Sequence, residues 1–259
     1  MAELQALIFD VDGTLADTER DGHRVAFNRA FEEAGLDWQW TVDLYGRLLS
    51  VTGGKERILH YLDHFNTAFR RPDDLTGFVA DLHRSKTRHY MAMMAEGAIP
   101  LRPGVKRLLE EARAAGVRLG IATTTTPENV TALIESTLPR GAMGWFEVIG
   151  AGDIVPKKKP APDIYDWVLR QMDLHPRQVI AFEDSGHGVT SAVDAGIVRV
   201  VVTVNAYTAG QDFSAATVVL DTLGEADVPA KGIAGPVPAN GLVDLAFLAS
   251  LDARAGTAA

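Results

Sequence analysis

The chain has 259 residues, 47% of them hydrophobic and 23% charged, which is typical of a soluble globular protein and argues against a disordered or fibrous one. Its net charge of −9 argues against a surface that binds nucleic acid or an anionic membrane, so a positive field for a phosphate must be local. Because there is no cysteine, disulfides, thiol nucleophiles and thiolate metal sites are excluded. A hard cation with oxygen ligands remains compatible with the composition.

No apolar run approaches the roughly 18 to 20 residues that a membrane-spanning helix needs. Residues 1–9 also lack the basic start of a signal peptide. We therefore expect a cytoplasmic protein whose partners include neither a membrane nor a nucleic acid.

The first predicted element is a buried strand over Leu4–Asp10, which is a run of mainly apolar residues. The strand leads into Asp10-Val11-Asp12-Gly13-Thr14, so two carboxylates lie two residues apart where a parallel strand opens into a ligand crevice. The glycine and threonine that follow indicate a tight turn. A nucleophile and a second acid or base at this point favour metal-assisted phosphoryl transfer.

Residues 17–95 separate this strand from the next core helix by far more than a strand-to-helix connection requires. Apolar residues recur near helical spacing over 25–34 and again over 58–65. We expect an inserted α-helical cap domain over 17–95, with Trp38 and Trp40 packed inside it. The core domain would then consist of residues 1–16 and 96–259.

Beyond the insertion, apolar β-branched runs alternate with helical patterns, which indicates a parallel sheet with helices on both faces. Pro103, Pro127 and Pro162 mark helix starts, and Gly116 and Gly196 mark helix ends. Residues 224–241 are rich in Gly, Pro and Ala and are expected to form a loop before a short helix over 242–251. The further predicted strands are 117–123, 146–151, 178–184, 199–204 and 217–220. The predicted fold class is α/β, a doubly wound, Rossmann-like parallel-sheet core with an inserted helical cap.

Polar residues follow the carboxyl ends of three more predicted strands. Thr123 ends the second strand, Lys159 lies in the loop after the third, and Glu183-Asp184 end the fourth. Since these ends meet at one edge of a parallel sheet, the set would supply a nucleophile, a cation for the phosphoryl oxygens and a proton-handling group.

Each of these residues also has a purely structural interpretation. Thr123 could be a strand-end hydroxyl before a helix entry, Lys157-Lys158-Lys159 a solvated loop, and Glu183-Asp184 the acidic start of a helix. Their combination with the Asp10 and Asp12 pair favours the chemical interpretation.

Four segments together resemble the signature motifs of the haloacid-dehalogenase-like phosphohydrolases, in the same order and over nearly the whole chain. The segments are Asp10-Val11-Asp12-Gly13-Thr14, Ile121-Ala122-Thr123, Lys159-Pro160 and Glu183-Asp184-Ser185. The family's dehalogenases usually lack the second aspartate, so Asp12 favours phosphate chemistry. No match to a dinucleotide-binding fingerprint is found, and no nucleotide cofactor is assigned.

The resemblance implies a role for each matched residue. Asp10 would be the nucleophile that forms an aspartyl-phosphate, and Asp12 the general acid and base for the leaving group and water. Thr123 and Lys159 would bind the transferring phosphoryl group. Asp10, Asp184 and the backbone carbonyl of Asp12 would hold Mg²⁺, and Glu183 would act on the metal indirectly or through water.

The predicted cap contains one segment that suits an anion. Thr52-Gly53-Gly54-Lys55-Glu56-Arg57 places small residues beside two cations, so backbone amides and side chains could together hold a phosphate. Lys86 could add a third cation. The alternative for each cation is that it is simply solvated on a helix surface.

In detail the chain resembles the β-phosphoglucomutase-like branch, and within it most of all the CbbY-type phosphatases that act on xylulose-1,5-bisphosphate. Residues 17–19, 52–57, 122–126 and 158–165 carry this closer match. The resemblance implies a monomeric enzyme that dephosphorylates a sugar bisphosphate, which would otherwise inhibit Rubisco. Rubisco would then be protected through metabolism and need not bind this chain. It also implies a substrate-binding set: Glu19, Thr52, Gly53, Gly54, Lys55, Arg57, Lys86, Thr123, Thr124 and Lys159.

The catalytic motifs leave the reaction type open, because a phosphomutase of the same branch or a less specific sugar-phosphate phosphatase would share them. One departure from the mutase pattern argues against a mutase. In the mutases the hinge histidine is one residue nearer the aspartate pair than His23 is to Asp12 here, and Gly22 is the residue that this chain has in addition. A non-catalytic sugar-phosphate sensor is a third possibility. The intact Asp10, Asp12, Lys159 and Asp184 argue against it.

Overall fold

The computed structural model describes residues 4–51 and 53–251, which divide into two compact units. One unit holds the chain up to Asp17 and again from Pro100, and the other holds Thr18–Ile99. The cap domain expected over 17–95 lies within the second unit apart from its first residue, and that unit also includes the four residues after Ala95. Within the described ranges, no helix is both long and apolar enough to span a membrane.

The first unit is built on a seven-stranded sheet with strand order β3-β2-β1-β4-β5-β6-β7, which agrees with the predicted α/β class. Neighbouring strands pair in parallel except β6 and β7, which are antiparallel. The strands are β1 Ala6–Phe9, β2 Arg118–Ala122, β3 Phe146–Gly150, β4 Val179–Glu183, β5 Val200–Thr203, β6 Val218–Leu220 and β7 Gly232–Ala234. The first six lie within the predicted ranges.

The strand β7 corrects the expectation that residues 224–241 contain no secondary structure. All three of its residues are exposed, so it lacks the apolar alternation by which a buried strand is predicted. The final helix, α9 (Leu245–Ser250), lies within the range expected for a helix at 242–251.

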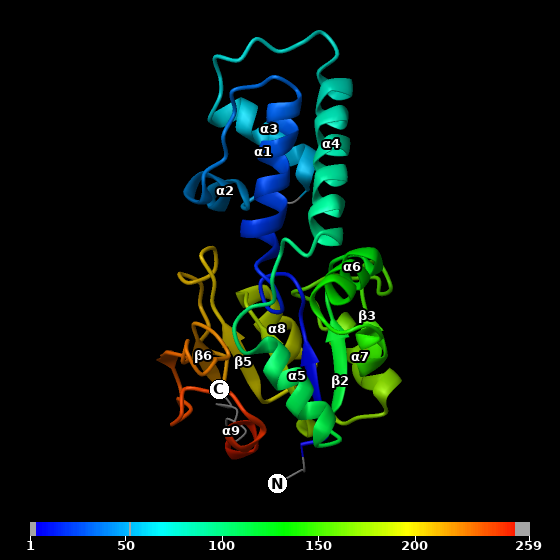
Figure 1. Cartoon of the computed structure of the whole chain (residues 1–259), viewed down its shortest axis with the longest axis vertical. Helices are drawn as coiled ribbons and strands as arrows, with labels where there is room; N and C mark the ends of the chain where they lie inside the picture. Colours follow the sequence, from blue (N-terminus) through cyan, green and yellow to red (C-terminus); the bar gives the residue numbers. More distant parts are fainter. Residues whose placement is uncertain (1–3, 52, 252–259) are drawn as a thin grey trace. The chain divides into compact units, whose positions relative to one another are not determined.

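Successive side chains of each strand point to opposite faces of the sheet, and helices cover both faces. On one face, Ile8 of β1 packs in a cluster with residues of α7 (Asp163–Met172) and α8 (Gly186–Asp194). The helix α5 (Val105–Ala114) contacts β2 and contributes no residue to that cluster. In Figure 1, α5 lies in front of the sheet and α8 behind it. The helix α6 (Pro127–Thr137) follows β2 in the chain.

The second unit is helical, with a π-helical turn at Thr18–His23 followed by α1 (Arg24–Glu33), α2 (Val42–Leu48), α3 (Gly54–His64) and α4 (Leu75–Ala95). The helices α1 and α3 both pack against α4. Aromatic side chains fill its centre: the Phe27 and Trp40 ring centroids lie 4.6 Å apart, and those of Trp38 and Tyr61 lie 5.4 Å apart. The two tryptophans therefore have the packing role predicted for them.

Candidate active site

Asp10 and Lys159 meet at the carboxyl edge of the parallel sheet. Asp10 directly follows β1, and Lys159 lies in the loop between β3 and α7. The Lys159 Nζ donates hydrogen bonds to Asp10 Oδ1 at 2.7 Å and to Glu183 Oε1 at 2.6 Å. All three side chains are less than a tenth exposed. The ends of three separate chain segments thus converge on one buried ion-pair cluster.

Burial and the charges in this cluster together shift the pKa values of Lys159, Glu183 and Asp184. Burial alone would lower the pKa of Lys159, but the carboxylates of Asp10 and Glu183 outweigh it and raise that pKa, so the ammonium stays charged. Burial raises the pKa of Glu183 to about 7 against the opposing charge of Lys159. Burial, together with the charges of Asp10 and Glu183, also raises the pKa of Asp184 well above its usual value.

The same carboxylates have the chemistry of a divalent-cation site. Asp10, Glu183 and Asp184 each offer an oxygen within 4.8 Å of the others, and all three are buried. Oxygen donors suit a hard cation such as Mg²⁺, and its charge would offset the mutual repulsion of these buried carboxylates. Glu183 Oε1 already accepts hydrogen bonds from Lys159 and from the hydroxyl of Tyr165, at 2.6 Å each. Glu183 Oε2 is buried and accepts no hydrogen bond from a described residue, so one oxygen of this carboxylate remains open beside Asp10 and Asp184.

Asp12 lies outside that carboxylate group and is half-buried in the turn after β1. The turn depends on Gly13, which has a φ of +83° and lies against Asp184. A Cβ at Gly13 would lie 2.2 Å from Asp184 Oδ2, so no other residue fits without displacing that carboxylate. That the Asp12 side chain transfers a proton while its carbonyl contacts a metal stays a prediction.

Thr123 follows β2 and is buried beside the same sheet edge. Its amide donates to the Gly150 carbonyl at 2.9 Å, and its Oγ1 accepts from the amide of Thr125 at 3.3 Å. Thr124 is exposed, and Thr126 caps α6 through the amide of Asn129. The helix-entry interpretation therefore applies to Thr126, while Thr123 is a buried residue at the end of β2 whose binding of a phosphoryl group stays a prediction.

Two residues of the cluster received no role from the sequence alone. Tyr165 is fully buried on α7 and donates to Glu183, and Asn205, just after β5, donates from Nδ2 to Asp184 Oδ2 at 2.7 Å. Asn205 carried the same signal as the residues that were singled out, since it directly follows a predicted strand. Tyr165 carried none, because its partner is 18 residues away in the chain.

In the helical unit, three of the polar side chains form a separate, partly buried chain of hydrogen bonds. Arg57 donates from one terminal nitrogen to the Tyr45 hydroxyl at 2.8 Å, and that hydroxyl donates to Glu19 Oε2 at 2.6 Å. The Arg57 Nε is buried, and no described residue accepts a hydrogen bond from it. Burial would raise the pKa of Glu19, but the charges of His23 and Arg57 and the Tyr45 bond together lower it.

Lys86 pairs with His23 in the same unit, with 3.0 Å between Lys86 Nζ and His23 Nδ1. Desolvation lowers the pKa of His23 to about 4, and the charge of Lys86 acts in the same direction against that of Glu19. At neutral pH the imidazole is therefore uncharged, so its Nδ1 accepts the hydrogen bond that Lys86 donates. This geometry gives His23 a defined contact, whereas the sequence assigned it no role.

The remaining predicted anion-binding residues lie at the start of α3. Gly53 has a φ of +96° and precedes the first residue of the helix, Gly54. Lys55 is exposed on the first turn, and Thr52 lies outside the described residues. The structure thus joins Glu19 with Arg57 and Lys86 with His23, and it places Gly53, Gly54 and Lys55 at a helix N-terminus.

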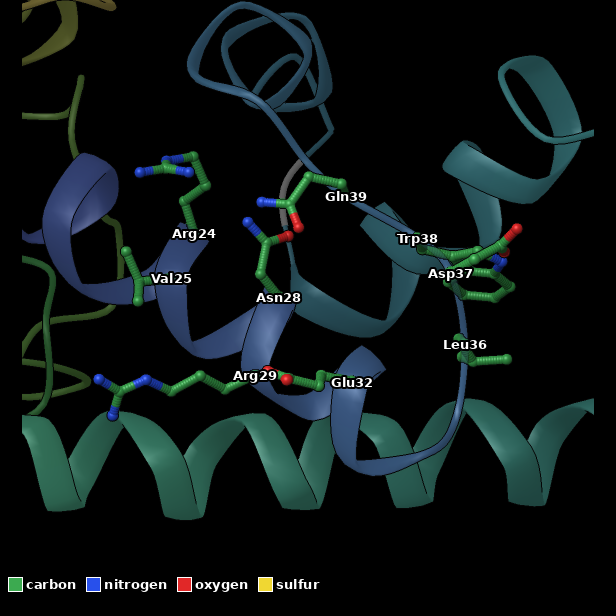
Figure 2. Close-up of a pocket in the computed structure, with 9 residues that line it drawn as sticks. All are labelled: Arg24, Val25, Asn28, Arg29, Glu32, Leu36, Asp37, Trp38 and Gln39. Carbon is green, nitrogen blue, oxygen red and sulfur yellow. The ribbon is translucent and has the colours of Figure 1, made fainter.

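A surface hollow of about 510 Å³ elsewhere in the helical unit is distinct from these clusters. Figure 2 shows that its wall comes from α1, through residues such as Arg24 and Asn28, and from the loop that carries Trp38 and Gln39. The nine lining residues include none of the predicted substrate-binding residues. Its lining mixes both signs of charge and gives no chemical indication of a ligand.

Comparisons with known proteins agree with the geometry of the core. The family model for haloacid dehalogenase-like hydrolases matches residues 4–196. Protein CbbY of Rhodobacter capsulatus is 51% identical over 214 residues, covering 83% of this chain and 91% of that protein. A phosphorylated carbohydrates phosphatase of Thermotoga maritima is 33% identical over 197 residues, covering 76% of this chain and 84% of that protein.

A solved structure supports the same relationship. The crystal structure of a CbbY mutant from Rhodobacter sphaeroides in complex with xylulose-(1,5)bisphosphate has a TM-score of 0.71 and 45% identity, and covers 86% of this chain and 96% of that one. The matched residues 4–196 include the strand that precedes Asp10, both phosphoryl-binding candidates and the acidic pair. The chain therefore belongs to the haloacid dehalogenase-like hydrolases and is a phosphoric monoester hydrolase.

Proposed function

We propose that this hydrolase is a Mg²⁺-dependent sugar-bisphosphate phosphatase that converts xylulose 1,5-bisphosphate to xylulose 5-phosphate. The observation that carries the proposal is the crystal structure of CbbY with that bisphosphate. The CbbY sequence in it is 45% identical to this chain, and the match covers 96% of the CbbY chain. The buried Asp10, Lys159 and Asp184 at one sheet edge supply the parts that phosphoryl transfer requires.

The reaction would proceed in two steps through Asp10. Its carboxylate forms a bond to phosphorus while the bond from phosphorus to the sugar oxygen breaks, and Asp12 gives that oxygen a proton. Water then attacks the aspartyl-phosphate and gives a proton to Asp12, and the bond between Asp10 and phosphorus breaks to release phosphate. Lys159, at 2.7 Å from Asp10, would hold a phosphoryl oxygen together with Thr123.

Mg²⁺ would be held by the Asp10 and Asp184 carboxylates and the Asp12 carbonyl, with Glu183 as an indirect partner. When bound, the cation would neutralise charge on the phosphoryl oxygens. The chain's own residues would orient the phosphate, exclude water and move the proton.

Residues of the helical unit would hold the phosphate that is not transferred. The Nε of Arg57 is buried, and no described residue accepts a hydrogen bond from it. A guanidinium can donate two parallel hydrogen bonds to one phosphate. Lys86 and Lys55 would add positive charge, and the amides of Gly53 and Gly54 would donate hydrogen bonds. The hydroxyl of Thr52 keeps its predicted role as a further hydrogen-bond donor. Glu19 and Thr124 are assigned to polar contacts with the sugar.

A panel of substrates tests the proposal. Phosphate release with Mg²⁺ is measured on ketose bisphosphates, aldose monophosphates and hexose 1-phosphates. The proposal expects the highest kcat/KM on the ketose bisphosphate. Conversion of a hexose 1-phosphate to its 6-phosphate would identify a mutase instead, and binding without turnover would identify a sensor.

A further inference from the structure

Asn205 contacts one of the proposed metal ligands from a loop outside the four sequence motifs. Its Nδ2 donates to Asp184 Oδ2 at 2.7 Å, and its Oδ1 accepts from the amide of Tyr207 at 2.9 Å. Since a backbone amide can only donate, the side-chain oxygen must face Tyr207 and the NH₂ group must face Asp184. The turn therefore fixes which end of the amide reaches the carboxylate.

The backbone on which Asn205 stands is also held in place. Arg102 is 7% exposed and donates to the carbonyls of Thr203 at 2.9 Å and Val204 at 2.6 Å, the two residues just before Asn205. The Asn205 amide donates to Thr208 Oγ1 at 3.0 Å. These bonds give the Asn205 side chain a fixed base from which to reach Asp184.

Gly13 lies against the same oxygen of Asp184. An added Cβ at Gly13 would be 2.2 Å from Asp184 Oδ2 and 2.8 Å from Asn205 Nδ2. The Gly13 carbonyl in turn accepts a hydrogen bond from Arg102. The turn after Asp10 and the loop after β5 therefore meet on one side of Asp184.

We propose that Asn205 is a positioning residue that holds Asp184 by Oδ2 and so presents Oδ1 to the divalent cation. The Asp184 Oδ2 accepts a hydrogen bond from Asn205 and packs against Gly13, so the carboxylate cannot rotate freely even before a cation binds. Groups that orient metal ligands in this way commonly change metal affinity 10- to 100-fold when removed. This inference rests on the proposed function, because it takes Asp184 as a ligand of the catalytic cation.

The chain contains a matched control for this contact. Asn240 is exposed, accepts from the amide of Leu242 through Oδ1 at 3.0 Å, and donates through Nδ2 to Asp244 Oδ2 at 3.3 Å. It thus makes the same turn and the same kind of bond to an aspartate, but its partner is a helix-capping residue away from the site. A change at Asn240 reports on the turn alone.

The test is Mg²⁺ binding to the metal-free full chain by calorimetry, for wild type, Asn205→Ser and Asn240→Ser. Serine can still accept from the amide two residues on but is too short to replace the bond to Asp184. We expect Asn205→Ser to weaken Mg²⁺ binding at least tenfold and Asn240→Ser to leave it unchanged, with equal far-UV circular dichroism. The phosphatase rate of Asn205→Ser should recover at saturating Mg²⁺, with an unchanged KM for the sugar phosphate.

Three outcomes would decide against the inference. Mg²⁺ affinity of Asn205→Ser within twofold of wild type would overturn it while leaving the proposed function intact. Equal weakening in both serine variants would show a general effect of loosened turns. If Asn205→Ser failed to fold, Asn205→Thr, which also retains the turn acceptor, replaces it with the same expectations. A wild-type chain that hydrolyses sugar phosphates without binding Mg²⁺ would overturn both the metal assignment and this inference.

Discussion

The Lys159 Nζ lies 2.7 Å from Asp10 Oδ1, an ion pair between residues 149 positions apart in the chain. Both side chains are less than a tenth exposed, and Lys159 also binds Glu183 at 2.6 Å. A buried ammonium between two carboxylates costs desolvation energy that its ion pairs must offset. Such an arrangement at the carboxyl edge of a parallel sheet is therefore best explained by its chemistry.

Asp10→Asn removes the proposed nucleophile and one charge of the metal site with almost no change in shape. We expect kcat for phosphate release to fall by at least roughly 10³-fold, because covalent catalysis and part of the cation affinity are lost together. Stopped assays of phosphate release, with circular dichroism to check the fold, measure this. Release at a near wild-type rate would contradict the aspartyl-phosphate mechanism.

Asp12→Ala should behave differently from Asp184→Ala, since the expected metal contact of Asp12 is its backbone carbonyl. We expect Asp12→Ala to slow turnover by roughly 10² to 10⁴-fold while Mg²⁺ affinity stays close to wild type. Asp184→Ala should lose the affinity. Calorimetry with Mg²⁺ on both variants checks the division of roles, which is wrong if Asp12→Ala loses binding as fully as Asp184→Ala does.

Arg57→Ala should act selectively on substrates with two phosphates. Loss of a buried two-pronged pair should cost on the order of 2 to 4 kcal/mol in kcat/KM for a bisphosphate and much less for a matched monophosphate. Arg71→Ala, at an exposed arginine of the same unit that binds Asp63, is the control and should change neither substrate. Equal losses on both substrates would assign Arg57 to the stability of the Tyr45 and Glu19 cluster instead.

His23 should titrate far below an ordinary histidine, because desolvation and the charge of Lys86 lower its pKa from 6.5 to about 4. Between pH 4 and pH 6.5, His23 is protonated in the unfolded chain but neutral in the folded one. The free energy of unfolding therefore falls as the pH falls from 6.5 to 4. The loss is on the order of 3 kcal/mol. Proton NMR of the imidazole measures the pKa, and Lys86→Met should raise it. Titration of His23 near 6.5 would contradict the desolvated, neutral imidazole.

The sequence predicted the core well where local patterning and the parallel-sheet rule act together. Apolar runs located the first six strands, and the rule that ligands bind at their carboxyl ends brought Asp10, Lys159 and Asp184 together. The strand β7 was missed because its exposed residues lie in a stretch rich in glycine and proline. Nothing local distinguishes such an edge strand from a loop.

In both units, contacts between residues far apart in the chain could not be predicted from local sequence patterns. Arg57 was singled out as a cation, but its partners Tyr45 and Glu19 belong to a packed helical unit whose geometry no spacing rule specifies. Tyr165 was in view only as part of a motif, because its hydroxyl acquires a role only once α7 packs on the sheet. Roles that depend on tertiary packing therefore required the structure.

The proposed function requires that the chain remove one phosphate from a sugar bisphosphate and transfer it to water. The most direct test follows xylulose 1,5-bisphosphate with Mg²⁺ by phosphorus NMR, with Asp10→Asn as the blank. We expect one equivalent of inorganic phosphate and accumulation of xylulose 5-phosphate, which is not hydrolysed further on the same timescale. No release above the Asp10→Asn blank, loss of both phosphates, or migration of the phosphoryl group to another sugar hydroxyl would contradict it.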